Sequence, residues 1–229
     1  MVDPTSPHNR FGVFAKYWQP GEVKTRLAQS VGGEAAAAIY RAFVMAITHR
    51  FETIAEDRML VYWPVESASA FKAIAPFWRA EAQSAGDLGT RMTAYFQQAF
   101  DDGCDRVLLI GSDSPNLPTE YVQQAFTSLA HDDVVLGPTS DGGYYLVGAR
   151  GKGPNIFENI AWSTPAVWEQ TQRNVRRAGL SCHELPPWYD VDDLQDLVRL
   201  SKDLQDAQEA PLRTLADVIQ PYCRPEHQD

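Results

Sequence analysis

Short apolar runs alternate along the chain with longer amphipathic or alanine-rich segments. In "RVLLIG", for example, four apolar residues run directly into Gly111. The apolar runs predict buried strands at 11–17, 59–63, 106–111, 133–138, 143–149 and 180–185. The intervening segments predict helices at 33–51, 88–103, 119–130, 164–179, 191–207 and 212–220. The spacing of apolar residues in 70–78 does not distinguish a helix from a strand.

Two helix starts carry conventional signals. Thr119 follows Pro118 and is expected to cap its helix, and Thr164 is expected at the N-cap with Pro165 in the first helical position. Strands separated by helices imply a mainly parallel sheet that is covered on both faces. We therefore expect an α/β fold, a single-domain three-layer α/β/α sandwich of Rossmann-like type. The domain is expected over 1–229, with its core at about 11–220.

Composition narrows the classes of partner. The formal net charge of -10 and a pI near 4.9 argue against nucleic-acid or anionic-membrane binding, both of which need a basic face. No apolar run is long enough to span a bilayer. Three cysteines, far apart and without a CxxC pair, argue against a disulfide framework or a cysteine zinc site and favour a cytoplasmic location. The five histidines show no ligand spacing.

A basic loop stands out in this acidic chain. Lys16 ends the first strand, and Lys24, Thr25 and Arg26 follow a turn at Gly21. Backbone N–H groups at such a turn, together with two or three cations, can hold a di- or triphosphate. The alternative is a solvated surface loop. The spacing does not match a P-loop.

Carboxylates follow two of the predicted strands. "LLIGSDSPNLP" delivers Asp113 to a strand end, where it can hold a divalent cation or merely cap a turn. "WYDVDDLQDL" crowds four aspartates at the start of a helix, and helix capping explains one or two of them. So many neighbouring carboxylates repel each other unless a cation binds between them. We expect a second metal ligand at Asp192 rather than at Asp190.

Two further turns are candidates for ligand contacts. Asp141, Gly142 and Gly143 lie between two strands, either as an ordinary hairpin or as a turn where backbone approaches a ligand. The segment "AGDLGTRM" has two interpretations. It can form a turn that contacts a phosphate or a base, or Asp87 can simply cap the helix that follows. Aromatic faces can stack on a sugar or base. The candidates from these considerations are Gly86, Arg91, Tyr144 and Trp162.

In their order along the chain, "FAKYWQPGEVKTRL", "GDLGTRM", "LLIGSDSPNLP", "VVLGPTSDGGYYLVGA", "IAWST" and "DVDD" resemble a known bacterial family. Its members have the nucleotide-diphospho-sugar transferase (glycosyltransferase A-type) fold and are provisionally described as glycosyltransferases. Some are associated with arsenosugar-biosynthesis or radical-SAM gene neighbourhoods. The resemblance spans about residues 11 to 200. More distant cousins include small nucleotidyltransferases.

The resemblance implies roles for individual residues. It implies a nucleotide site at Lys16, Lys24, Thr25 and Arg26, metal-binding aspartates at Asp113 and Asp192, and an acceptor or sugar pocket at Asp141, Gly142 and Gly143. The sequence departs from the family pattern in two places. Trp18 and Glu22 replace a proline and a basic residue of the loop, and Asp193 stands where threonine is usual.

We therefore expect a transferase that uses Mg²⁺ or Mn²⁺ and a nucleotide-sugar donor. Asp113 and Asp192 would hold the ion, Lys24 and Arg26 would neutralise the leaving nucleotide, and Asp141 would serve as base for the acceptor. The alternative is a nucleotidyltransferase that takes a nucleoside triphosphate and releases pyrophosphate. A lesser alternative is a nucleotide-binding protein without turnover. The sequence is also compatible with a homodimer.

Overall fold

The computed structural model of this chain describes residues 7–223, and the outermost residues of the expected 1–229 domain lie outside that range. Its centre is a seven-stranded sheet in the order β3-β2-β1-β4-β6-β5-β7. Only β6 runs against its neighbours β4 and β5, and the other pairs are parallel. The strands are β1 (Asn9–Lys16), β2 (Asp57–Trp63), β3 (Arg79–Ala82), β4 (Arg106–Ile110), β5 (Val134–Pro138), β6 (Tyr144–Arg150) and β7 (Cys182–Glu184).

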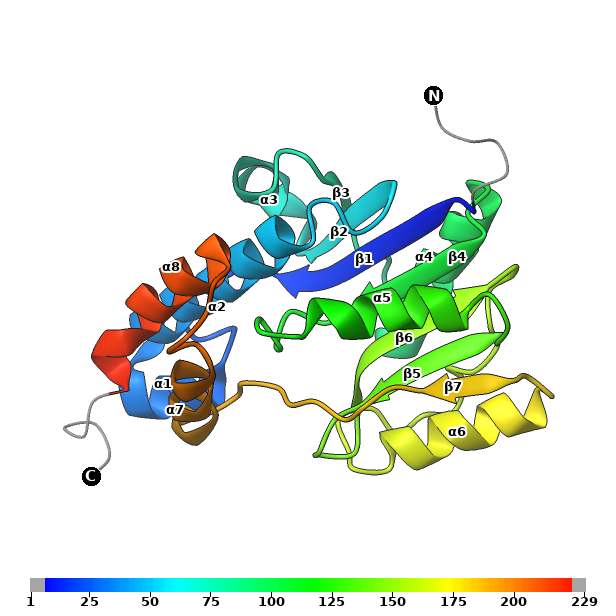
Figure 1. Cartoon of the computed structure of the whole chain (residues 1–229). Helices are drawn as coiled ribbons and strands as arrows, with labels where there is room; N and C mark the ends of the chain where they lie inside the picture. Colours follow the sequence, from blue (N-terminus) through cyan, green and yellow to red (C-terminus); the bar gives the residue numbers. More distant parts are fainter. Residues whose placement is uncertain (1–6, 224–229) are drawn as a thin grey trace.

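Helices cover both faces of this sheet, as the alternation of elements predicts. Helix α5 crosses in front of the strands and α4 lies behind them, while α2 and α8 pack side by side (Figure 1). The α-helices are α1 (Thr25–Val31), α2 (Gly33–Arg50), α3 (Ala68–Ile74), α4 (Leu88–Asp101), α5 (Thr119–Ser128), α6 (Val167–Arg177), α7 (Leu194–Asp203) and α8 (Ala210–Ile219). Two short 3₁₀ turns, η1 (Val65–Ser67) and η2 (Gln220–Tyr222), complete the described elements.

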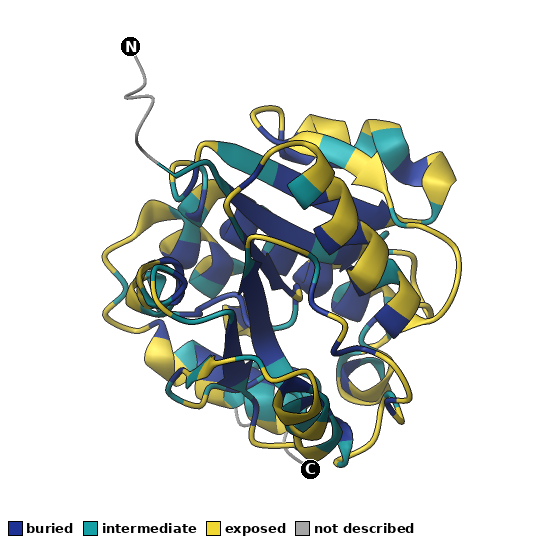
Figure 2. Ribbon diagram, turned by 90° about the vertical axis from the view of Figure 1, so that its right-hand side faces the viewer, coloured by how far each residue is buried: buried dark blue, intermediate teal, exposed yellow. Residues whose placement is uncertain are grey.

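Alternate residues of the central strands point into two separate cores. Leu108 and Ile110 of β4 join the core under α2, α5 and α8, whereas Val107 and Leu109 join the core under α4 and α6. The central strands are accordingly buried while the helices expose their outer faces (Figure 2). This period-two burial on both faces confirms the expected three-layer α/β architecture.

The structure corrects two expected helix starts. Helix α6 begins at Val167, because Thr164 donates to the Ala161 carbonyl at 2.7 Å and forms a local turn instead of an N-cap. At α5, Pro118 occupies the cap position and no side chain caps the helix. Two short elements, α1 and β3, were not expected. The open segment 70–78 supplies the end of α3 and the loop that follows it.

Within residues 7–223, none of the helices combines the length and the apolar character that a membrane crossing requires.

Candidate functional site

A cleft of about 750 Å³ opens at the carboxyl ends of β1 and β4. Its walls come from the loop after β1, the loop after β4, the start of α4, and the segment before α7. Parallel sheets commonly bind ligands at this edge. The expected site residues that line the cleft are Lys16, Lys24, Thr25, Arg26, Arg91, Asp113, Tyr144 and Asp192.

Lys24 is at the centre of the polar wall. It immediately precedes α1 and has a left-handed backbone, with φ of 47° and ψ of 46°. Residues other than glycine pay for this conformation and tend to adopt it where a site requires it. Its side chain is only 3% exposed, and its ammonium pairs with both Asp113 and Asp192, the latter at 2.9 Å. The turn thus aims a buried cation between the two carboxylates.

The charges of this cluster reinforce each other. Burial alone would lower the pKa of Lys24, but the carboxylates of Asp113 and Asp192 outweigh it and raise the pKa above its ordinary value. Arg26 pairs with the second oxygen of Asp192 from a largely exposed position. The Val191 N–H donates to the Asp113 carbonyl at 2.9 Å and fastens the two acidic segments together. The two aspartates that the sequence singled out therefore converge on a single cation position.

Asp190 is a cleft residue that the sequence analysis set aside. Ser114 donates to its Oδ1 at 2.7 Å. Burial and the neighbouring negative charge of Asp113 raise the pKa of Asp190 to about 7, against the opposing effects of Ser114 and Lys24. The sequence does carry a signal for Asp190. On an extended chain, side chains two residues apart point to the same side, so a cleft position for Asp192 also indicates one for Asp190.

Tyr40 and Ser112 form the floor beside the aspartates. Their hydroxyl oxygens are 2.6 Å apart, and the Lys16 N–H donates to the Tyr40 hydroxyl at 3.0 Å. Burial raises the pKa of Tyr40 to about 12, so the phenol stays protonated. Helix α2 carries Tyr40, and no motif marked it in the sequence. This network fixes the end of β1 against the loop after β4.

Arg91 closes the opposite wall. Its Nε donates to the Gly86 carbonyl at 2.9 Å, and its Nη1 donates to Gln83 Oε1 at 3.1 Å. Its guanidinium also lies 5.1 Å from the ring centroid of Trp63. Asp87 caps α4 by accepting from the Thr90 N–H at 2.8 Å. Gly86 thus positions Arg91 through its carbonyl, while Arg91 itself faces the cleft.

The structure does not bring the hairpin candidates to this cleft. Asp141 Oδ1 accepts from the Thr139 hydroxyl at 2.5 Å and from the Gly143 N–H at 3.2 Å within its own turn. Gly142 has a φ of 93°, and a Cβ there would meet the Pro165 carbonyl oxygen at 2.4 Å. Gly142 is therefore required by close packing before α6. A ligand role for Asp141, Gly142 or Gly143 stays a prediction.

Three other candidates, Gly21, Trp162 and the Gly86 described above, also lie outside the cleft lining. Gly21 has a φ of 83° and serves the turn that precedes Lys24. Trp162 packs against α4, because a Cβ on Gly89 would meet the indole at 3.1 Å. The described cleft residues include Tyr144 but neither Gly21 nor Trp162. Their binding roles likewise stay predictions.

The donor chemistry of the aspartate cluster suits a hard divalent cation. Carboxylate oxygens are the ligands that Mg²⁺ and Mn²⁺ prefer. The Lys24 ammonium occupies the point on which Asp113 and Asp192 converge, so it marks where a cation is already held. Four basic and four acidic side chains line the cleft: Lys16, Lys24, Arg26 and Arg91, with Glu22, Asp113, Asp190 and Asp192. The protein charges alone therefore do not neutralise a polyphosphate.

One protein-family model matches this chain. A family model described as "Uncharacterized protein conserved in bacteria (DUF2064)" covers residues 46–164. Among curated proteins, none matches this sequence significantly.

Solved structures give a strong likeness and many weaker ones. A protein from Desulfovibrio desulfuricans G20, provisionally described as a nucleotide-diphospho-sugar transferase, is 38% identical, with 95% of this chain and 99% of that chain covered and a TM-score of 0.85. The 4-diphosphocytidyl-2C-methyl-D-erythritol synthase of Anaerococcus prevotii DSM 20548 is 10% identical, with coverage of 87% and 99% and a TM-score of 0.56. A cytidylyltransferase from Leptospira borgpetersenii serovar Hardjo-bovis is 13% identical, with coverage of 94% and 95% and a TM-score of 0.55. The two weaker likenesses show a shared fold.

Proposed function

This chain belongs to the bacterial DUF2064 family, and from that premise we propose that it is a metal-dependent transferase acting on nucleotide substrates. In its specific form, the protein binds a nucleotide sugar and transfers the glycosyl group to a small acceptor. The provisional description of the D. desulfuricans relative supports a nucleotide-sugar donor. The weaker structural neighbours support only the fold.

The observation that carries the proposal is the convergence of Asp113 and Asp192 on one cation position beside the basic loop. In the proposed site these two carboxylates hold Mg²⁺ or Mn²⁺, with Asp190 available beside them. When bound, the ion would supply positive charge to the diphosphate of the donor. Lys24, which pairs with the same carboxylates, would then be available to bind phosphate oxygens.

The charge balance of the cleft supports metal dependence. Because the acidic side chains nearly balance the basic ones there, even with Asp190 partly protonated near neutral pH, an anionic donor gains little net attraction from the protein alone. A divalent ion converts the lining to a net positive charge. Lys16, Arg26 and Arg91 approach the same space from three segments and can orient a diphosphate. The base for the acceptor hydroxyl is unassigned, since Asp141 lies outside the lining.

A second candidate is nucleotidyl transfer, and one observation favours it. Four basic side chains line a single cleft, an arrangement that also suits the longer phosphate chain of a nucleoside triphosphate. A phosphorylated substrate would then attack the α-phosphate in line, with pyrophosphate leaving. The same residues serve both reactions, so the product distinguishes them.

The first experiment is a thermal-shift panel of nucleoside triphosphates and nucleotide sugars, each with and without Mn²⁺. A ligand at a hundred times its dissociation constant adds about 2.7 kcal/mol to the free energy of unfolding. Stabilising donors are then incubated with candidate acceptors. Release of nucleoside diphosphate supports glycosyl transfer, and release of pyrophosphate supports the second candidate. If no nucleotide stabilises the protein, both transfer proposals fail.

Asp113→Asn tests the metal assignment directly. We expect it to abolish the Mn²⁺ dependence of nucleotide binding and to cost on the order of 3 kcal/mol in the barrier to transfer. The exposed Asp206→Asn is the matched control. If Asp113→Asn leaves both nucleotide affinity and its Mn²⁺ dependence unchanged, the non-catalytic binding alternative replaces the enzyme proposal.

Cellular setting belongs to the same proposal. The three cysteines are free, which is compatible with the reducing cytoplasm expected from the sequence. The association with arsenosugar or radical-SAM chemistry and the homodimer stay predictions.

A further inference from the structure

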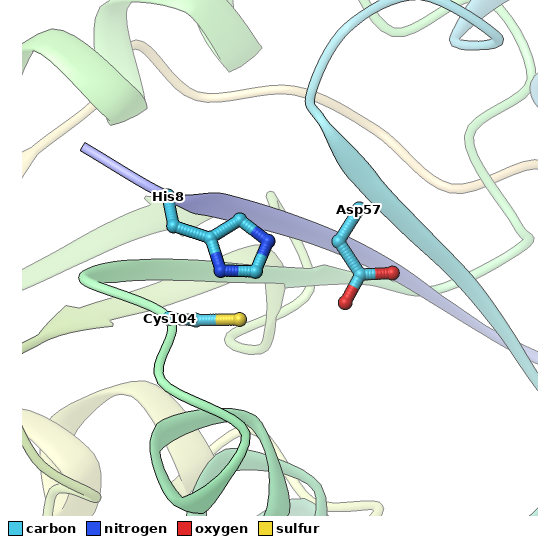
Figure 3. Close-up of side chains that lie close together, drawn as sticks. All are labelled: His8, Asp57 and Cys104. Atoms are coloured by element: carbon cyan, nitrogen blue, oxygen red, sulfur yellow. The ribbon is translucent and has the colours of Figure 1, made fainter. Parts of the chain in front are cut away.

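A second cluster of potential metal ligands lies at the opposite end of the sheet. His8 precedes β1, Asp57 begins β2, and Cys104 immediately precedes β4. One ligand atom from each of the three residues lies within 4.8 Å of the others, and the side chains face a common space (Figure 3). Since β1 separates β2 from β4, three neighbouring strands bring these residues together.

We propose that His8, Asp57 and Cys104 form a separate binding site for a divalent transition-metal ion of the zinc class. Zinc binds thiolate sulfur, imidazole nitrogen and carboxylate oxygen in combination, commonly with tetrahedral geometry. Three protein ligands leave a fourth position for water or another ligand. A thiolate and an imidazole favour Zn²⁺ or Co²⁺ over Mg²⁺, so this site differs in chemistry from the carboxylate cluster of the cleft.

The backbone around the cluster is held firmly. The His8 N–H donates to Asp105 Oδ2 at 2.7 Å, and the Asp105 N–H returns a bond to the His8 carbonyl at 2.8 Å. Reciprocal bonds of this kind fix the start of β1 against the residue that follows Cys104. Within residues 7–223, the His8 ring donates to and accepts from no other side chain, and the thiol of Cys104 is free.

Arg10 binds one oxygen of the Asp57 carboxylate, while its own Nη1 is buried without a hydrogen-bond partner among the described residues. Its Nε donates to Asp57 Oδ2 at 2.6 Å, and its Nη2 donates to Asp102 Oδ2 at 2.7 Å. No hydrogen bond within the described part of the chain goes to Asp57 Oδ1, so one oxygen is available to an ion. Ligating carboxylates are usually oriented by such an outer partner, and the partner matters for affinity.

The local charge also favours a divalent ion. With Cys104 bound as thiolate, its negative charge adds to the carboxylates of Asp57 and Asp102, both close to Arg10, and of Asp105, which binds His8. Arg10 and Arg79 are the basic groups paired with this cluster. Arg79 also pairs with Glu81, so the anions outnumber the cations and a divalent ion reduces this excess of negative charge. The proposed ion therefore completes a network that is otherwise negative.

The distance to the cleft makes the site independently testable. At about 3.3 Å per residue, the eight steps of extended chain from His8 to Lys16 span roughly 26 Å. An ion here does not touch the nucleotide site. Its measured role would be binding and stabilisation of the strand starts, so the inference does not rest on the proposed transferase activity.

Co²⁺ provides a spectroscopic probe because cobalt–thiolate bonds give a charge-transfer absorption. The full-length chain would carry Cys182→Ser and Cys223→Ser, since Cys182 is exposed beside His183 and could bind metal adventitiously. With excess Mg²⁺ present to occupy the cleft, we expect the thiolate absorption to saturate at one Co²⁺ per chain and to be displaced by Zn²⁺. Absence of this absorption in the background protein overturns the proposal.

His8→Gln is the decisive variant because the His8 ring makes no side-chain hydrogen bond within residues 7–223, so the fold should survive. We expect Zn²⁺ affinity, measured by competition with Co²⁺, to fall by more than the roughly 10–100-fold that loss of an outer partner costs. Cys104→Ser should remove the absorption, with folding checked by circular dichroism. Unchanged affinity in a folded His8→Gln protein overturns the assigned ligand set.

Discussion

At the scale of single residues, Lys24 links the fold to the proposed chemistry. Its ammonium is nearly buried, and it holds Asp113 and Asp192 together before any substrate arrives. Removing one partner from a buried charge cluster leaves the others uncompensated. A metal ion at the same point would repel the lysine and free it for phosphate. Lys24 is therefore expected to oppose metal binding alone and to favour it once a nucleotide is present.

Lys24→Gln tests this coupling. We expect Mn²⁺ to bind the nucleotide-free variant more tightly than the native protein, because the two carboxylates lose their internal cation. Nucleotide affinity should fall roughly 10- to 100-fold, which corresponds to about 1.5–3 kcal/mol for a hydrogen bond to a charged group. Isothermal titration calorimetry measures both. Lys152→Gln, on an exposed loop, is the control. Weaker Mn²⁺ binding in the variant would contradict the idea that Lys24 and the metal ion compete for the same two carboxylates.

The sequence predicted part of this cluster and missed the rest for identifiable reasons. Lys24, Asp113 and Asp192 were found because charged residues follow apolar strands, which places them at one sheet edge. Tyr40 was missed because it lies within an apolar helix whose partners come from distant loops. Conversely, Asp141 resembled a site residue, but its carboxylate is used by the hairpin turn itself.

At the scale of elements, the start of α7 sets the position of Asp192. Asp193 accepts from the N–H groups of Gln195 and Asp196, and Asp196 accepts in return from the N–H groups of Asp192 and Asp193. This capping box explains two of the four clustered aspartates without any ligand. The other two, Asp190 and Asp192, line the cleft.

Asp193→Ala should therefore weaken α7 without removing a cleft residue. We expect a loss of about 1 kcal/mol in the free energy of unfolding, typical of an N-cap aspartate. Urea denaturation provides the measurement, and Asp206→Ala serves as the matched exposed control. An unchanged midpoint would show that the cap contributes nothing to stability.

The centre of the sheet is sensitive to volume at Gly148 of β6. A Cβ at this position would lie 2.3 Å from Leu108 Cδ2, 2.6 Å from Val135 Cγ1 and 3.2 Å from the Val107 carbonyl oxygen. Both neighbouring strands, β4 and β5, press on the site, so relief requires shifts in each of them.

Gly148→Ala is expected to reduce the free energy of unfolding by about 2–3 kcal/mol through overpacking. Chemical denaturation would show the loss. Gly153→Ala is a fitting comparison, because its Cβ would meet Gln97 at an ordinary 3.6 Å. Equal stability of the two variants would mean that the sheet absorbs the added methyl group.

Elements were predictable where burial leaves a periodic signal. The apolar strands β1, β2, β4, β5 and β6 lie where the runs predict them, and α2 and α4 begin as expected. The edge strand β3 was not predicted, since its sequence "RAEA" is mostly exposed and lacks alternation. Helix α1 is short and follows a left-handed residue, which no helix-start pattern anticipates.

At the scale of the whole molecule, the candidate cleft and the proposed zinc-class site lie at opposite ends of one sheet. The carboxyl ends of β1 and β4 carry the cleft, and their amino ends carry the proposed zinc-class site. The alternation of strands and helices in the sequence predicted the location of the cleft, because parallel strands all end at the same edge of the sheet. It could not predict the proposed zinc-class site, because His8, Asp57 and Cys104 are far apart in sequence and meet only through strand order.

A half-exposed carboxylate, Asp133, contributes pH-dependent hydrogen bonds to the β5–β7 side of the sheet. Asp133, just before β5, accepts from the Ser181 N–H at 3.0 Å and hydroxyl at 2.9 Å, and pairs with Arg150 of β6 at 3.2 Å. The Ser181 backbone and side-chain bonds, followed by Arg150, lower the pKa of Asp133 below its ordinary value. A lowered folded-state pKa adds stability above the unfolded pKa, near 3.9, and loses it as pH falls through the folded value.

Asp133→Asn should therefore destabilise the protein by about 1 kcal/mol at neutral pH, a modest value because the group is largely solvated. The difference from the native protein should shrink as the pH is lowered below about 4, since the native carboxyl is then increasingly protonated. Thermal unfolding from pH 7 to pH 3 measures this difference, with Asp206→Asn as control. A destabilisation that stays constant across this range would mean that the side chain acts through packing, and the charge-assisted bonds to Ser181 and Arg150 would not be its source.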